Sequence, residues 1–141
     1  DISSEIVTNL QNGQPSDRCN ELTTLCSGAG INVFTAFKTL EYALCCSEDN
    51  IYHMIEALKK CYTDLGPKLE AKVGLLSQLS EKAACVWLFI RARNKCKGAV
   101  AQYISQVICD QHELKKKGEQ IEKEFVIPEY LKNAIYSVTE R

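Results

Sequence analysis

The sequence predicts an all-α fold: a compact, disulfide-stapled bundle of five to seven helices that forms a single helical domain over residues 1–141. Two observations predict the helices. Apolar residues recur at helical spacing along most of the chain, and no run of strand length alternates apolar and polar residues. A third observation predicts the staples, because eight cysteines are the even number that four disulfides require.

The cysteines are the unusual part of the composition; they are Cys19, Cys26, Cys45, Cys46, Cys61, Cys85, Cys96 and Cys109. A zinc site is not expected, because no C-x-x-C motif occurs and the two histidines, His53 and His112, stand alone. The pairing stays open. Cys45 and Cys46 are adjacent, too close for ordinary disulfide geometry, so we expect them to reach two different elements.

The N-terminal half predicts four helices. Residues 2–11 place apolar side chains on one stripe, and residues 16–26 place Cys19 and Cys26 on a face that we expect to point inward. Asn32 is expected to cap a helix over residues 33–44 that runs into Cys45 and Cys46. Ser47 is expected to cap the next helix, residues 48–62, whose first turn is acidic and whose last turn is basic.

In the C-terminal half, Pro67 is expected to begin a long helix that breaks near residues 93–98, with Gly98 as the breaking residue. Residues 100–108 continue the helical pattern, and a polar stretch follows them. Pro128 stands where the first turn of a C-terminal helix would lie, so we expect a last helix to follow it.

The most apolar stretch, AACVWLFIRARNKC at residues 83–96, has two interpretations. One is the central helix of a filled bundle. The other is the wall of a cavity for an apolar ligand, since bundle interiors commonly hold such pockets. The ligand-pocket candidates of the second interpretation are Phe34, Phe37, Val86, Trp87, Phe89, Ile90 and Tyr103. Sequence alone does not distinguish a filled core from a hollow one.

Charge and motifs favour no catalytic or nucleic-acid function. The net charge is -1, and the basic clusters at residues 91–97 and 115–117 fit solvated helix faces better than a phosphate-binding stripe. His53 and His112 fit exposed helical positions, and Glu41 fits capping and solubility. No nucleophile, zinc, phosphate-loop or dinucleotide motif occurs, so we expect no enzyme, no cofactor and no metal.

The expected location is extracellular. The chain begins DISSEIV, without Met, as a mature secreted form would, and no apolar run approaches the roughly 20 residues that span a bilayer. The spacing Cys19-x6-Cys26-x18-Cys45 is similar to the first three cysteines of insect chemosensory proteins, small secreted helical carriers of apolar molecules. That family has two residues before its fourth cysteine, whereas Cys46 follows at once here and four further cysteines have no counterpart.

Together these observations predict a secreted, non-enzymatic binding protein that carries a small apolar ligand in its helical core. The alternative is an extracellular signal, toxin or inhibitor that acts through its surface on another protein, a role with which a homodimer would be compatible. Neither hypothesis involves nucleic acid or a membrane span.

Overall fold

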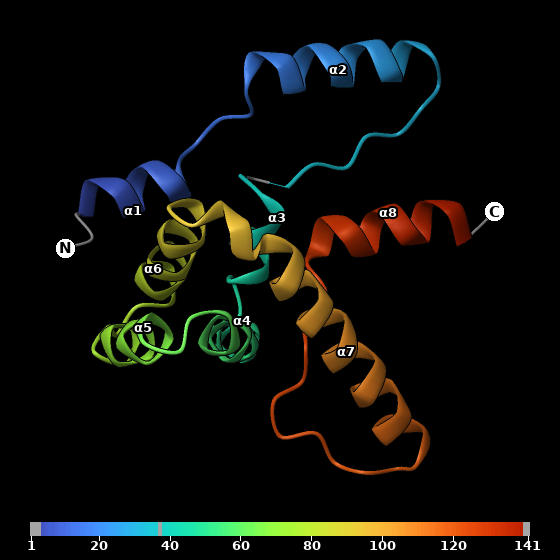
Figure 1. Ribbon diagram of the computed structural model, residues 1–141. Helices are drawn as coiled ribbons and strands as arrows, with labels where there is room; N and C mark the ends of the chain where they lie inside the picture. Colours follow the sequence, from blue (N-terminus) through green and yellow to red (C-terminus); the bar gives the residue numbers. More distant parts are fainter. Residues whose placement is uncertain (1–3, 37, 140–141) are drawn as a thin grey trace.

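The computed structural model describes residues 4–36 and 38–139, and within them every regular element is helical, with eight α-helices, one short 3-10 helix and no strand. The all-α prediction is therefore confirmed, with one helix more than the upper end of the predicted range. The elements are α1 (Ser4–Gln11), α2 (Asp17–Gly28), α3 (Leu40–Leu44), α4 (Glu48–Cys61), α5 (Leu65–Gly74), α6 (Leu79–Arg91), η1 (Asn94–Cys96), α7 (Lys97–Lys116) and α8 (Glu129–Thr139) (Figure 1).

Helix α4 packs against α5, α6 and α7. Its acidic first turn and basic last turn complement the helix dipole, as predicted. Its buried side chains are Asn50, Ile51, His53, Met54, Ile55, Ala57 and Leu58. Helix α6, which covers most of the segment 83–96, packs against α1, α3, α4 and α5, as a central helix would; it buries Val86 and Ile90 and leaves Trp87 and Phe89 half-buried.

A glycine sets how closely α5 approaches α4. A Cβ at Gly66 would lie 2.5 Å from the Cα of Lys59, a separation that real Cβ atoms do not show. The Gly66 N–H also donates to the Tyr62 carbonyl oxygen at 2.8 Å, which links the end of α4 to the start of α5. The α4–α5 packing therefore depends on the absence of a side chain at this position.

The helix predicted over residues 33–44 is much shorter in the structure and covers only Leu40–Leu44. The Thr39 hydroxyl accepts a hydrogen bond from the Tyr42 N–H at 3.3 Å and so caps α3 at this later point. The residues before it include the β-branched Ile31, Val33 and Thr35, which are poor helix formers. Val33 and Phe34 therefore lie in an irregular part of the chain, where both are half-buried, and their apolar spacing does not indicate a helix.

The long helix predicted from Pro67 is also divided differently. Its first part, α5, begins at Leu65 and ends at Gly74. Helix α6 follows after a short connector and packs against α5. The next break falls before Gly98, because Arg93 has non-helical backbone angles (φ -134°, ψ 63°) and η1 follows it. Gly98 lies inside the first turn of α7.

Helix α7 ends at a glycine that reverses the chain. Gly118 has φ 75°, in the left-handed region, and the Glu119 N–H donates to the Leu114 carbonyl oxygen at 3.0 Å, as in a Schellman motif. Residues 117–128, which we call the strap, then run back along the bundle and lead into α8 (Figure 1).

Helix α2 lies at the outside of the molecule, away from the other helices in Figure 1. None of its twelve residues, all within the described part of the chain, is buried. Cys19 and Cys26, with Thr23, are half-buried whereas the other residues of α2 are exposed, so the face expected to point inward is the less exposed one, but it does not reach the buried core.

The disulfide staple is not supported by the structure. All eight cysteines lie in the described ranges and all are free thiols, three of them buried (Cys45, Cys85 and Cys96). Cys45 is fully buried, whereas its neighbour Cys46 is exposed and donates from Sγ to the Tyr42 carbonyl oxygen at 3.4 Å. The two adjacent cysteines thus face different surroundings, but neither bonds to another element.

Candidate functional site

An apolar cavity of about 670 Å³ lies between α7, α3 and the strap. This volume falls within the roughly 300–1,000 Å³ of typical small-molecule pockets. The side chains that line it come from α3 (Leu40, Glu41, Leu44), α4 (Met54), α6 (Ile90), α7 (Lys97, Gly98, Val100, Ala101, Ile104, Ser105, Ile108), the strap (Phe125, Ile127, Pro128) and α8 (Leu131, Ile135). Glu41, Lys97 and Ser105 are the polar residues of this lining.

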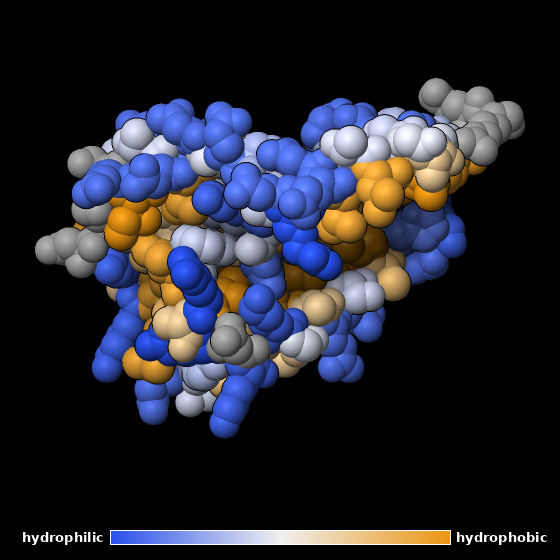
Figure 2. All heavy atoms as spheres, turned by 90° about the horizontal axis from the view of Figure 1, so that it is seen from above, coloured by the Kyte–Doolittle hydropathy of each residue, from blue (hydrophilic) through white to orange (hydrophobic). Residues whose placement is uncertain are grey.

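The cavity is deep on one side and open on the other. At its floor Met54 is completely buried, and Ile90, Val100 and Ile104 are nearly so. At its mouth four large apolar lining residues remain exposed: Leu40, Ile108, Ile127 and Ile135. Figure 2, which views the molecule from above, shows hydrophobic atoms along the C-terminal helix. Burial of these side chains by a ligand would remove apolar surface from water, which is favourable.

A buried amide holds the strap against the bundle. Asn50, on α4, is 1% exposed, and its side chain pairs with the backbone of Val126 through two hydrogen bonds. Nδ2 donates to the Val126 carbonyl oxygen at 2.7 Å, and Oδ1 accepts from the Val126 N–H at 2.8 Å. Since Phe125, Ile127 and Pro128 surround this contact and line the cavity, Asn50 positions one of its walls.

A second polar contact lies one turn further along α4. The His53 Nε2 is 2.7 Å from the Lys123 carbonyl oxygen, which can only accept, so Nε2 carries the proton and donates. Gln111, on α7, donates to the same oxygen at 2.7 Å and accepts from the Phe125 N–H at 2.8 Å. The interpretation of His53 as an exposed residue is wrong, because it is 7% exposed and attaches the strap to the core.

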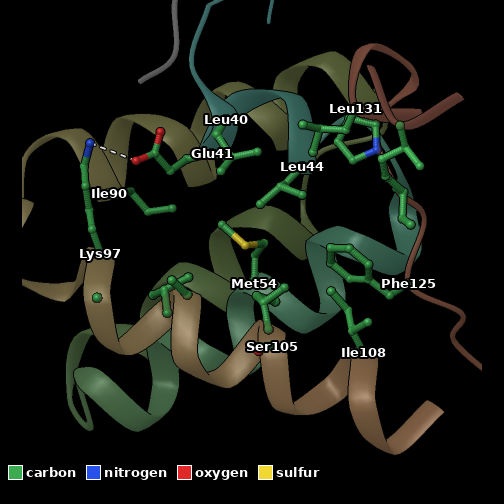
Figure 3. Close-up of a pocket in the computed structure, with 17 residues that line it drawn as sticks. Leu40, Glu41, Leu44, Met54, Ile90, Lys97, Ser105, Ile108, Phe125 and Leu131 are labelled. Carbon is green, nitrogen blue, oxygen red and sulfur yellow. Dashed lines mark ion pairs between the residues drawn. The ribbon is translucent and has the colours of Figure 1, made fainter. Parts of the chain in front are cut away.

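One end of the cavity is charged. The Lys97 Nζ lies 2.8 Å from the Glu41 carboxylate, and Figure 3 shows this ion pair beside Ile90, with Phe125 and Ile108 at the opposite end. The Lys97 side chain is 47% exposed and that of Glu41 only 22%. The cavity therefore has an apolar end and an end with both a donor and an acceptor.

Hydrogen bonds hold Glu41 in its ionised form. Burial alone would raise the pKa of its carboxyl group, but hydrogen bonds from Lys97, from its own backbone and from Thr39, together with the Lys97 charge, outweigh burial and hold the pKa below its usual range. Thr39 is itself fixed, since its Oγ1 accepts from the Trp87 Nε1 at 3.2 Å. Trp87, Thr39 and Glu41 thus form a chain of contacts that ends at the cavity.

The structure distributes the seven predicted pocket residues widely. Ile90 lines the cavity. Val86 is buried in the core, and Trp87 lies edge-on to Tyr42 with ring centroids 6.0 Å apart. Phe89 packs edge-on against Tyr62, the Tyr103 ring lies 4.4 Å from the Lys60 Nζ, and Phe34 is half-buried before α3. Phe37 lies outside the described residues.

Two polar residues of the site were missed by the sequence analysis. Asn50 and His53 fall at positions i and i+3 on the apolar face of α4, beside Ile51 and Met54. A polar residue on such a face is buried only where it finds a partner, so this placement was a usable signal. The Glu41–Lys97 pair carried no signal, because the two residues lie on elements far apart in the sequence.

Comparison of the chain with protein-family models, with curated proteins and with solved structures finds no match. In the described part of the chain, no three His, Cys, Asp or Glu side chains are grouped so that they could hold a metal ion. Among the same residues, no helix has the length and apolar character needed to cross a bilayer.

Proposed function

We propose that this protein is a non-enzymatic binding protein that holds a small apolar ligand in the cavity between α7, α3 and the strap. The observation that carries the proposal is the cavity itself, about 670 Å³ in volume and lined by apolar side chains except for Glu41, Lys97 and Ser105. Each methylene group that a ligand buries there contributes about 0.8 kcal/mol, so a flexible alkyl chain gains affinity with length.

The test fills the cavity from its rim. Ala101 is exposed on α7 and lines the cavity, so the substitution Ala101→Trp places an indole in the ligand's space with little cost to folding. Ala99 is exposed on the same helix and is absent from the lining, so Ala99→Trp is a matched control. The probe is dodecanol, with binding measured by isothermal titration calorimetry and the fold of each variant checked by circular dichroism.

We expect Ala101→Trp to weaken dodecanol binding by at least about tenfold, the equivalent of about 1.4 kcal/mol, and Ala99→Trp to leave it unchanged. Failure of the wild-type protein to bind dodecanol would overturn the proposal and favour the alternative, action on another protein through the surface. Equal binding by the wild type and by the correctly folded Ala101→Trp variant would also overturn it, because the probe would then bind elsewhere.

The location of the protein is proposed on the cysteine count alone. Eight cysteines in 141 residues are compatible with four disulfides formed in an oxidising compartment, and such staples typically contribute about 2–4 kcal/mol each. Titration of free thiols in the denatured protein, purified from its source without reductant, tests this. At most one free thiol per chain supports a secreted, disulfide-bonded form, and a larger number contradicts it.

A further inference from the structure

The charged end of the cavity limits which head group a bound ligand can have. A single-chain amphiphile with its tail between Phe125 and Ile108 would bring its head to Glu41 and Lys97, since these lie at the opposite end of the cavity (Figure 3). Both charges are already neutralised by each other at 2.8 Å. A head group with a net charge therefore adds an uncompensated charge at this end, which is unfavourable in a partly buried site.

The two charges differ in how firmly they are held. Glu41 is half-buried and accepts hydrogen bonds from its own backbone and from Thr39 as well as from Lys97, so it stays in place and stays ionised. Lys97 is 47% exposed and can turn its ammonium group into water. A carboxylate head would thus meet a fixed negative charge, whereas an ammonium head could displace Lys97 from Glu41.

We propose that the cavity selects single-chain molecules whose head group is neutral and both donates and accepts a hydrogen bond, as a long-chain alcohol does, and that Glu41 is the residue that excludes carboxylates. The alcohol oxygen accepts from the Lys97 Nζ while its O–H donates to the Glu41 carboxylate, and such hydrogen bonds to charged groups are stronger than those between neutral groups. This inference rests on the proposed function, because it assumes that an alkyl chain occupies the cavity.

Three probes with the same tail isolate the head group: dodecanol, dodecanoate and dodecylammonium, each titrated at neutral pH below its micellar concentration. We expect the wild-type protein to bind dodecanol most tightly and dodecanoate at least about tenfold more weakly, the ratio that one lost charge-assisted hydrogen bond produces. Dodecylammonium should bind with intermediate affinity.

The variant Glu41→Gln keeps the size of the side chain and removes its charge. In this variant we expect the difference between dodecanol and dodecanoate to shrink to less than about threefold, because dodecanoate then pairs with Lys97 without opposition. Lys97→Gln is the complementary variant, and it should strengthen dodecylammonium binding while dodecanoate remains the weakest ligand.

The outcomes separate this inference from the proposed function. If no probe binds to the wild-type protein, the proposed function fails. If all three probes bind alike, or if Glu41→Gln binds dodecanol but leaves the exclusion of dodecanoate unchanged, the cavity binds apolar chains and the head-group inference is overturned. If Glu41→Gln fails to fold, the ranking of the three probes on Lys97→Gln tests the head-group inference. If Lys97→Gln binds dodecanoate as tightly as dodecanol, Glu41 does not exclude carboxylates.

Discussion

The substitution Asn50→Ala tests whether a single buried amide holds the strap. It removes the hydrogen bonds from Asn50 to the Val126 carbonyl oxygen (2.7 Å) and from the Val126 N–H to Asn50 (2.8 Å). Each bond contributes about 1 kcal/mol net to stability. Val126 is exposed, so water can reach its freed backbone groups, and the further penalty for buried unpaired groups does not apply in full. We therefore expect a loss of about 2 kcal/mol in the free energy of unfolding.

Urea unfolding followed by circular dichroism measures this loss, and amide hydrogen exchange locates it. The Val126 amide should exchange up to about 25-fold faster in the variant, the factor that corresponds to 2 kcal/mol. Gln106→Ala is the control, because Gln106 is an exposed amide that bonds only locally to Asp110 on α7; it should change stability by less than about 0.5 kcal/mol. An Asn50→Ala protein with wild-type stability and unchanged exchange at Val126 would refute the reasoning.

Three further predictions concern the packing, a charge and a thiol. Gly66→Ala should destabilise the protein by about 1–3 kcal/mol in urea unfolding, because the Cβ of the new alanine would lie 2.5 Å from the Lys59 Cα. The control is Gly74→Ala, which should be neutral or stabilising because a Cβ at this position meets no atom within 4 Å. Equal effects of the two substitutions would contradict the α4–α5 packing. Since the pKa of Glu41 is lowered on folding, its charged form stabilises the protein above its ordinary pKa and this contribution is lost as the pH falls through the lower, folded value. Glu41→Gln should thus be more destabilising at about pH 7 than at about pH 3, and a difference independent of pH would refute the pKa assignment. Burial, followed by the nearby Cys46 and Glu41 charges, raises the pKa of the Cys45 thiol. In the reduced native protein, iodoacetamide should therefore label exposed Cys109 much faster than Cys45, as measured by peptide mass spectrometry. Comparable labelling rates would be inconsistent with the structure.

The elements that the sequence predicts well are those stabilised by their own periodic pattern. Helix α4 is the clearest case, because its apolar spacing, acidic first turn and basic last turn all agree, and the structure ends it within one residue of the expected position. Residues 33–39 show the opposite case. Their apolar spacing resembles that of a helix, but β-branched residues weaken helix formation, and the Thr39 cap begins α3 only at Leu40.

The cavity could not be predicted from the sequence, because its walls meet through contacts between distant parts of the chain. Asn50 and Val126 are separated by 76 residues, and no local pattern connects a polar residue on α4 with the backbone of the strap. The predicted pocket walls are mainly aromatic, yet Trp87 and Phe89 pack against Tyr42 and Tyr62 instead. Of the two aliphatic candidates, Ile90 lines the cavity, whereas Val86 is buried in the core. The aliphatic residues that do line the cavity look like ordinary core residues in the sequence.

The most direct test of the ligand site uses the single methionine of the chain. Met54 is completely buried and lies at the floor of the cavity, so ¹³C-labelling of its methyl group gives one NMR resonance that reports on the cavity alone. On addition of dodecanol, we expect this resonance to shift and to show intermolecular nuclear Overhauser effects to the alkyl chain. A Met54 methyl resonance that stays unchanged at saturating dodecanol would contradict the assignment of this cavity as the binding site.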